Sequence, residues 1–343
     1  MRSWKRYFVW LPLLCLLLAG CSGAADRSAE RTLFAMDTVM ELKAEGANAD
    51  KAVAAAVKRI TELEKLLSVT LETSEIYAVN HAAGQSVSVS ADTGTLVSDA
   101  LSFCDETRGA LDISIYPVLK AWGFTTQEYR VPDAEELQEL LGRVDYAKVQ
   151  YDPAASTITV PAGMEIDLGS VAKGYTGDVV MQVFRDAGVT SGLISLGGNV
   201  QALGSKPDGS AWRIAVQDPT GDGYIGVLDV RDEAVVTSGG YERYFEQDGE
   251  IYWHIIDPAT GAPAKNGVVS ATVVSPSGVR CDALSTALFI LGQDAAEDYW
   301  RAHDDFDYLL VLEDGTMIVS EGIADRFVPE DDWTDHQKIV VKK

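Results

Sequence analysis

Apolar residues recur at helical spacing in some segments of the chain and cluster in short β-rich runs in others. Between residues 50 and 67 they fall at every third or fourth position, which predicts an amphipathic helix. The same spacing predicts further helices over 93–107, 133–141, 170–187, 282–291 and 295–302. The β-rich runs predict strands over 32–43, 149–160, 192–200, 244–247, 251–256, 308–312 and 316–320. The first of these strands is interrupted by Met36-Asp37-Thr38.

The order of these elements indicates the fold class. Between Trp212 and Pro276 short strands follow one another, with turns such as Asp248-Gly249 between them, which predicts an antiparallel meander. Strands and helices do not alternate regularly in the rest of the chain, so a doubly wound parallel sheet is not favoured. No linker divides the chain cleanly. We therefore predict one α+β unit with two lobes.

The first 20 residues predict an export signal. They begin with basic residues, and the apolar stretch over 7–18 is shorter than the roughly 20 residues needed to span a bilayer. The sequence Leu-Ala-Gly-Cys at 18–21 resembles the signal of a bacterial lipoprotein, which is cut before the cysteine and lipidated there. An ordinary secretory signal with a chance cysteine is the alternative interpretation.

A lipoprotein signal would fix where the protein works. Cys21 would carry the lipid, palmitate included, and would anchor the mature chain to the bacterial cell membrane, facing outside the cytoplasm. Small and polar residues over 21–31 predict a flexible tether. The rest of the chain, 32–343, is then the functional domain.

Composition limits the function further. The chain carries 52 acidic and 28 basic residues, a formal net charge of −24, and no basic stripe that could neutralise a nucleic-acid backbone. This argues against a nucleic-acid partner and makes a cation more necessary at any site that binds a polyphosphate. Cys104 and Cys281 could form a disulfide in an oxidising compartment, but we favour two buried thiols.

Two segments carry residues suited to a metal and a phosphate. In 167–178 a turn with a carboxylate opens a helix that has Lys173 in its first turn. Backbone N–H groups, the positive end of the helix dipole and the lysine would all face an anion there. In 281–292 the side chains of Asp282 and Thr286 are four residues apart on a predicted helix. They share one face and offer two hard oxygens to a cation such as Mg²⁺.

His254 is the candidate general base. It precedes a predicted tight turn at 257–261, and a neutral imidazole suits removal of a proton from an incoming hydroxyl. A strand-end histidine bonded to backbone is the structural alternative. The glycine-containing segments 197–199 and 237–240 would allow close approach of the backbone to a ligand.

Five motifs occur in one order along the chain: MDTVM at 36–40, DLGSVAKGY at 167–175, SLGGN at 195–199, HIIDPATG at 254–261 and DALSTA at 282–287. Each motif alone is weak, but together they resemble the ApbE-type flavin transferase family, over about residues 32–323. The resemblance implies a Mg²⁺-dependent enzyme that cleaves FAD, attaches FMN through its phosphate to a threonine or serine of an acceptor protein, and releases AMP. Acceptors of such enzymes are typically membrane-linked electron-transfer proteins with a short Ser/Thr flavinylation motif. The implied fold is a two-lobed α+β architecture with an antiparallel, tunnelling-fold-like sheet, flanking helices and FAD in the cleft between the lobes.

The resemblance also assigns roles to residues. Mg²⁺ would be held by Asp282, Thr286 and the backbone carbonyl of Ser170, although the family more often has Gly or Ala at the position of Ser170. A backbone ligand tolerates that difference. His254 would lie beside Asp282, and either could be the base. Flavin or nucleotide contacts would come from Met36, Tyr77, Ala121, Trp122, Gly123, Asp167, Lys173, Gly198, Asn199 and Ile256. For Trp122 the alternative is a core position.

Two other functions remain compatible with these residues. The same metal site could let water attack FAD, which would make the protein a pyrophosphatase that yields FMN and AMP. A flavin-binding lipoprotein that stores or delivers the cofactor would bind FAD without turnover, and Asp282, Thr286 and His254 would then be idle.

Overall fold

The computed structural model describes residues 28–343. The expected signal peptide, Cys21 and the first part of the expected tether lie outside this range. Residues 28–31, which we expected in the tether, instead form the first half of strand β1 (Ser28–Ala35). They are ordered by pairing with β2 (Thr38–Glu45), with Arg31 opposite Leu42. Cross-strand hydrogen bonds thus order a polar segment whose composition predicted a tether.

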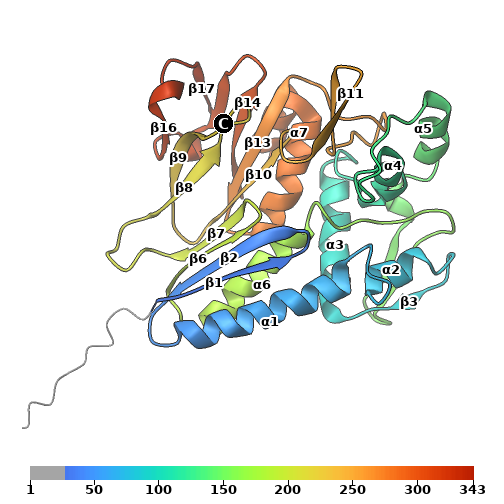
Figure 1. The fold of residues 1–343 in the computed structure, drawn as a ribbon, viewed down its shortest axis with the longest axis horizontal. Helices are drawn as coiled ribbons and strands as arrows, with labels where there is room; N and C mark the ends of the chain where they lie inside the picture. The colour runs from blue at the N-terminus through green and yellow to red at the C-terminus, as the bar shows by residue number, and fades with distance from the viewer. Residues whose placement is uncertain (1–27) are drawn as a thin grey trace, which may run out of the picture.

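A nine-stranded sheet forms the centre of the molecule (Figure 1). Its spatial order is β1, β2, β6, β7, β10, β13, β14, β15 and β17, and all neighbours are antiparallel except β15 and β17. The remaining seven strands of this sheet are β6 (Ser191–Leu196), β7 (Asn199–Gly204), β10 (Ala234–Gly239), β13 (Val268–Ser275), β14 (Asp307–Leu312), β15 (Met317–Ser320) and β17 (Lys338–Val341). The α+β class and the antiparallel sheet are therefore confirmed.

Three long helices cover one face of this sheet: α1 (Ala49–Leu67), α6 (Ala172–Asp186) and α7 (Gly278–Arg301). The alternation of side chains along each strand sends one set of residues toward these helices, such as Val236 against α7. Helix α7 begins at Gly278, one turn earlier than predicted. Gly292, with φ 76° and ψ 174°, separates its two parts, as predicted for helices 282–291 and 295–302.

A small second sheet and the short helix α8 (Glu321–Ala324) cover the opposite face. In this sheet β9 (Tyr224–Val230) pairs with β8 (Trp212–Gln217) and with β16 (Phe327–Pro329). Val235 of β10, the neighbour of Val236, packs here. The predicted single meander over 212–276 was wrong, because its strands divide among three sheets. Local turn signals fix hairpins but do not specify which sheet each hairpin joins.

The second lobe lies at the end of the helical layer. Its helices are α2 (Glu75–Asn80), α3 (Ala91–Glu106), α4 (Tyr116–Trp122) and α5 (Ala134–Leu141). Its strands form a small sheet of β3 (Val87–Ser88), β5 (Thr157–Thr159) and β4 (Gln150–Asp152), and a hairpin of β11 (Tyr244–Gln247) and β12 (Glu250–Trp253).

Cys104 and Cys281 are both free and buried, as favoured above. No helix within 28–343 is long and apolar enough to cross a membrane.

Two tight turns lie side by side at one end of the large sheet. Met36 and Asp37 join β1 to β2 with φ of 50° and 58°, and Gly197 and Gly198 join β6 to β7 with φ of 64° and 88°. Positive φ at both central residues fits the type I′ turn, whose twist matches that of the flanking strands. The interruption that the sequence indicated at 36–38 is therefore a hairpin turn. Because the start of β2 pairs with the end of β6, both turns lie at the same end of the strands.

Helices α6 and α7 cross in close contact at two glycines, Gly174 and Gly278. A Cβ on Gly174 would lie 2.7 Å from the Cβ of Asp282 and closer still to the Gly278 carbonyl oxygen. The two helices also cap each other. Asp178 of α6 accepts hydrogen bonds from the N–H groups of Gly278 (2.7 Å) and Val279 (2.9 Å) at the start of α7. Asp282 of α7 accepts one from the N–H of Gly174 in α6 (2.8 Å).

The crossing predicts the effect of adding one methyl group. Gly174→Ala gains helix propensity of about 1 kcal/mol, but the new Cβ has no space at the crossing. We expect a net destabilisation of about 1–3 kcal/mol, because overpacking a closed contact forces the helices apart. Urea unfolding measures it. Gly221→Ala, where a Cβ would meet nothing within 4 Å, is the control. Equal stability of both variants would contradict the assigned crossing.

Candidate active site

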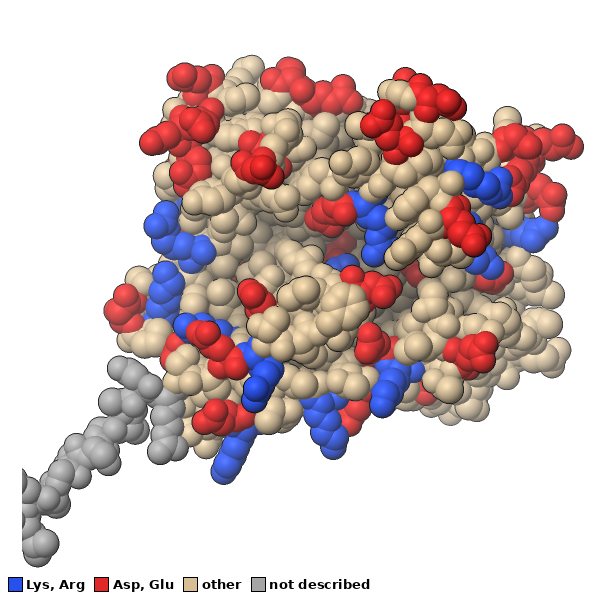
Figure 2. Space-filling view, in the orientation of Figure 1, with Lys and Arg blue, Asp and Glu red and all other residues tan. Residues whose placement is uncertain are grey.

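A cavity of about 1040 Å³ lies where the two lobes meet. The large sheet contributes the β1–β2 turn, the β6–β7 turn, and strand β10 with the turn that follows it. The helices contribute the chain after α1, the start of α6, and α7. The second lobe contributes the segments on both sides of α4 and the segment after β12. Figure 2 shows a hollow near the middle of the visible face, with basic and acidic side chains at its edge. Segments far apart in the sequence therefore contribute to one site.

Asp282 and Thr286 both line this cavity from α7. Asp282 is 5% exposed, and its Oδ2 accepts the N–H of Gly174. Gly174 lies in the first turn of α6, where backbone N–H groups have no carbonyl partner within the helix, so Asp282 caps the start of α6. Within residues 28–343 the Ser170 carbonyl accepts no hydrogen bond, and Ser170 also lines the cavity. The lone pairs of this carbonyl therefore stay available.

Three hydroxyl groups beside Asp282 form a chain of hydrogen bonds. Ser285 donates its proton to the Asp282 carbonyl (3.0 Å), so Ser285 must accept at its contact with Ser238 (2.9 Å). Ser238 has then used its only proton, and Thr286 must be the donor in the 3.3 Å contact between them. The lone pairs of the Thr286 oxygen stay available. The cavity therefore holds a carboxylate, a hydroxyl oxygen and a backbone carbonyl that suit a hard divalent cation.

The charge state of the Asp282 carboxyl group would depend on a bound cation. Burial raises the pKa of its carboxyl group, although nearby Lys173 and the N–H of Gly174 act in the opposite direction. A cation would stabilise the ionised form. Among residues 28–343 no group of three or more His, Cys, Asp or Glu side chains could hold a metal. A metal here would depend on hydroxyl, backbone and substrate oxygens, as Mg²⁺ sites that bind phosphates often do.

His254 lines the cavity just after β12. Its backbone N–H and its Nδ1 both contact the carbonyl of Arg243, at 3.1 and 3.2 Å. Because a carbonyl only accepts, Nδ1 carries the proton and Nε2 keeps its lone pair. Burial and the positive charges of Arg243 and Lys173 lower the pKa of His254 to about 4. The ring is therefore neutral at pH 7 and can accept a proton at Nε2.

The turn before α6 presents the predicted anion-binding groups. Asp167 and Lys173 both line the cavity, and the Asp167 carboxylate accepts the N–H of Gly169 (2.7 Å). Burial raises the pKa of Asp167, and the nearby Arg243 and Lys173 oppose this effect. Carboxylate, lysine and helix start thus face the same space.

Four more predicted contacts also reach this cavity: Met36, Gly198, Asn199 and Ile256. Glu64 holds the turn at Met36, whose N–H donates to its carboxylate (2.6 Å). Asn199 is 1% exposed, and its side-chain amide interacts with the Asp282 carboxylate, whose pKa it lowers. A hydrogen-bond donor beside a carboxylate favours the ionised form. This residue therefore supports the charge of Asp282 in the cavity.

Four predicted cofactor contacts do not line the cavity. The Tyr77 ring stacks on His81 with centroids 3.8 Å apart. Trp122 is 2% exposed, packs against Tyr252 and donates its indole N–H to the Gly261 carbonyl (2.8 Å). Its core position, the alternative considered above, is what the structure has. Ala121 is buried beside it, and Gly123, with φ 82°, ends α4.

Three cavity residues were not predicted from the sequence: Tyr241, Glu242 and Arg243. They follow the 237–240 segment noted for its glycines. Burial within the cavity raises the pKa of Glu242 to about 7; Lys173 and Arg243 act to lower it, and Asp282 to raise it. Charged residues in a turn are common on any surface, so nothing in their types marked them.

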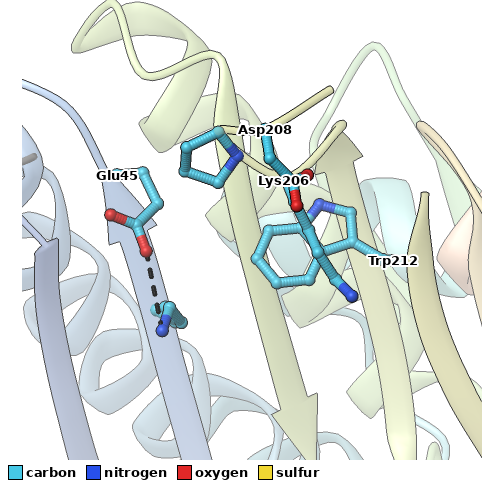
Figure 3. Close-up of a pocket in the computed structure, with 6 residues that line it drawn as sticks. Glu45, Lys206, Asp208 and Trp212 are labelled. Atoms are coloured by element: carbon cyan, nitrogen blue, oxygen red, sulfur yellow. Dashed lines mark ion pairs between the residues drawn. The ribbon is translucent and has the colours of Figure 1, made fainter. Parts of the chain in front are cut away.

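A second, smaller pocket of about 370 Å³ lies at the surface beside β2 and the loop before β8 (Figure 3). Glu45 pairs there with Lys43 (3.5 Å), and Lys206, Pro207, Asp208 and Trp212 complete the wall. It contains none of the predicted site residues. The chemistry is therefore assigned to the larger cavity.

FAD:protein FMN transferases are among the relatives that sequence comparison finds. A FAD:protein FMN transferase from Treponema pallidum is 34% identical over 338 residues, covering 92% of this chain and 93% of the relative. One from Klebsiella pneumoniae is 36% identical over 287 residues, covering 82% and 89%. Both relatives are thus matched over most of their length.

Solved structures agree with these relatives. The ApbE protein from Thermotoga maritima superposes with a TM-score of 0.82 at 34% identity, covering 86% of this chain and 98% of that one. The apo flavinyl transferase ApbE from Pseudomonas stutzeri gives 0.75 at 28% identity, covering 89% and 94%. The ApbE family model matches residues 36–310, which include all five motifs and the cavity built from them. The chain belongs to the ApbE family.

Proposed function

We propose that the chain transfers FMN from FAD to a serine or threonine hydroxyl of an acceptor protein, releases AMP, and depends on Mg²⁺. The relatives that match it over most of its length are FAD:protein FMN transferases, so the chain is an FMN transferase with FAD and a protein as substrates. One observation carries the assignment of the site. Asp282, Thr286 and Ser170 line one cavity, together with Lys173.

Charge neutralisation is the main requirement of phosphoryl transfer. A divalent cation bound by Asp282, Thr286 and Ser170 would neutralise the diphosphate of FAD. Lys173 and the N-terminus of α6 add positive potential on the same side. The glycine turn at Gly198 fits a polar ligand held close to the backbone.

His254 provides a proton acceptor. The acceptor hydroxyl gives its proton to Nε2 of His254, and its oxygen forms a bond to the phosphorus of the FMN phosphate. The bond from that phosphorus to the bridging oxygen breaks, and AMP leaves with the electron pair. The carbonyl of Arg243 keeps the imidazole in the tautomer that this step needs.

Location and partner belong to the same proposal. Lipidation at Cys21 would hold the enzyme at the membrane outside the cytoplasm, near membrane-linked electron-transfer proteins. The Leu-Ala-Gly-Cys sequence at 18–21 supports this location. A Ser/Thr-containing segment of such a protein would enter the cavity.

A direct assay tests the proposed reaction. The protein is incubated with FAD, Mg²⁺ and a purified electron-transfer subunit that carries a candidate acceptor segment, and the mixture is denatured. We expect flavin fluorescence to remain on the acceptor band in a gel, and a chelator to abolish it. FMN and AMP released without labelled acceptor would instead indicate a pyrophosphatase, and FAD bound without turnover a storage protein.

Asp282→Asn tests the metal site. The amide oxygen can still accept the N–H of Gly174, so the fold and the melting temperature should persist. Loss of the negative charge should reduce Mg²⁺ affinity and slow transfer by about 100-fold or more. Calorimetry with Mg²⁺ and single-turnover transfer measure the two effects. Asp294→Asn, an exposed position on the same helix, is the control. Normal Mg²⁺ binding by the Asp282 variant would remove this residue from the site.

The proposed base has a measurable pKa. Nitrogen NMR of the protein without ligands should show His254 with its proton on Nδ1 and a titration midpoint near 4. The imidazole would then stay neutral as the pH falls through about 6.5, and transfer would show no inflection there from this residue. The exposed His81 serves as a reference resonance. A midpoint near 6.5 for His254 would contradict the buried, cation-flanked environment described here.

A further inference from the structure

Strand β1 has one edge that no other strand covers. It is the first strand of the nine-stranded sheet, and within residues 28–343 it pairs only with β2 (Figure 1). The carbonyl of Val39 in β2 accepts the N–H of Gly197 and therefore points toward β6. Phe34, the partner of Val39 in β1, then belongs to a pair that exchanges no hydrogen bonds. The N–H and carbonyl groups of Phe34, and those of Thr32 two residues earlier, thus point to the free edge.

The side chains at this edge are apolar and exposed. Phe34 is 71% exposed, the highest value for a large apolar side chain within residues 28–343, and Val39 opposite it is 55% exposed. Leu33, on the other face of the strand, packs against the core with α1. Soluble proteins usually protect an edge strand with charged side chains or proline. The segment 32–35 has neither, so it is open to pairing with another extended chain.

This edge leads directly to the cavity. Phe34 lines the cavity, and β1 ends at the turn of Met36 and Asp37, which line it as well. Glu64 of α1 holds that turn in place through the N–H of Met36. A strand added to β1 would advance about 3.3 Å per residue along the edge and would bring its next residues to the cavity mouth. The second substrate is a protein, and its hydroxyl has to enter this cavity.

We propose that the acceptor protein docks by adding an extended segment to the free edge of β1. An apolar residue of this segment packs on Phe34 and Val39, and its serine or threonine passes the turn into the cavity. This docking rests on the proposed function, which requires a protein acceptor. Main-chain hydrogen bonds to Thr32 and Phe34 supply affinity, and the apolar contact supplies selectivity.

Thr32→Pro tests the main-chain contacts. Proline removes an N–H that points away from β2, so the β1–β2 pairing and the melting temperature should persist. We expect the KM for the purified electron-transfer subunit of the transfer assay to rise about tenfold or more, because a hydrogen bond is lost and the ring obstructs the edge. The kcat and the affinity for FAD should stay within about twofold. Phe34→Ser should also raise this KM, because the apolar contact is lost.

Val340→Pro is the matched control at the opposite edge of the same sheet. The N–H of Met317 in β15 donates to the carbonyl of Gln337, so in this parallel pair the N–H of Val340 points away from β15. Val340 is 41% exposed and lies outside the cavity. This variant should leave the KM for the subunit unchanged. An increase equal to that of Thr32→Pro would contradict docking at β1.

Hydrogen exchange tests docking without turnover. The native protein is mixed with the same subunit after the serines and threonines of its candidate segment have been changed to alanine. We expect the N–H groups of Thr32 and Phe34 to exchange about fivefold more slowly or less, and that of Val340 to be unaffected. Slowed exchange caused by a second copy of the enzyme, without the subunit, would contradict the proposal.

The outcomes separate docking from the proposed reaction. If the native protein flavinylates the subunit but Thr32→Pro leaves KM unchanged, or exchange at Thr32 and Phe34 is not slowed, docking at β1 is wrong and the reaction stands. Slowed exchange with a subunit that never receives flavin would reject the reaction alone. Neither protection nor labelling would reject both.

Discussion

One hydrogen bond organises this site. The Asp282 carboxylate of α7 accepts the N–H of Gly174 in the first turn of α6, where no carbonyl within the helix can accept it. The two helices can approach closely enough for this bond because Gly174 and Gly278 carry no side chains. One contact therefore aligns the helices and orients the carboxylate. Asp178 makes the complementary contact at the start of α7 and strengthens the same crossing.

The rest of the fold serves to surround this crossing. The large sheet supports both helices, and its two type I′ turns bring Met36 and Gly198 to the rim of the same cavity. The second lobe closes the other side, where the chain after β12 places His254 and the carbonyl of Arg243 fixes its tautomer. The basic side chains, the neutral imidazole and the hard oxygens thus come from separate elements. Each element is positioned by packing that is independent of any ligand.

Local signals in the sequence predicted much of this arrangement. Helical spacing placed Asp282 and Thr286 on one face, and the turn before α6 marked Lys173, because both features depend on residues close in sequence. Long-range packing was harder to predict. Trp122 was expected near the cofactor, but the β11–β12 hairpin covers it, and no local pattern reports that contact. Arg243 was missed for a similar reason, because the contact of its carbonyl with His254 forms only in the folded chain.

We propose that Asp282, Thr286 and the Ser170 carbonyl hold a divalent ion against the diphosphate of FAD. A crystal structure of the protein with FAD and Mg²⁺ tests this coordination. We expect an ion about 2.0–2.1 Å from these three oxygens and from at least one phosphate oxygen. A diphosphate bound away from α7, or an ion coordinated by other residues, would contradict it.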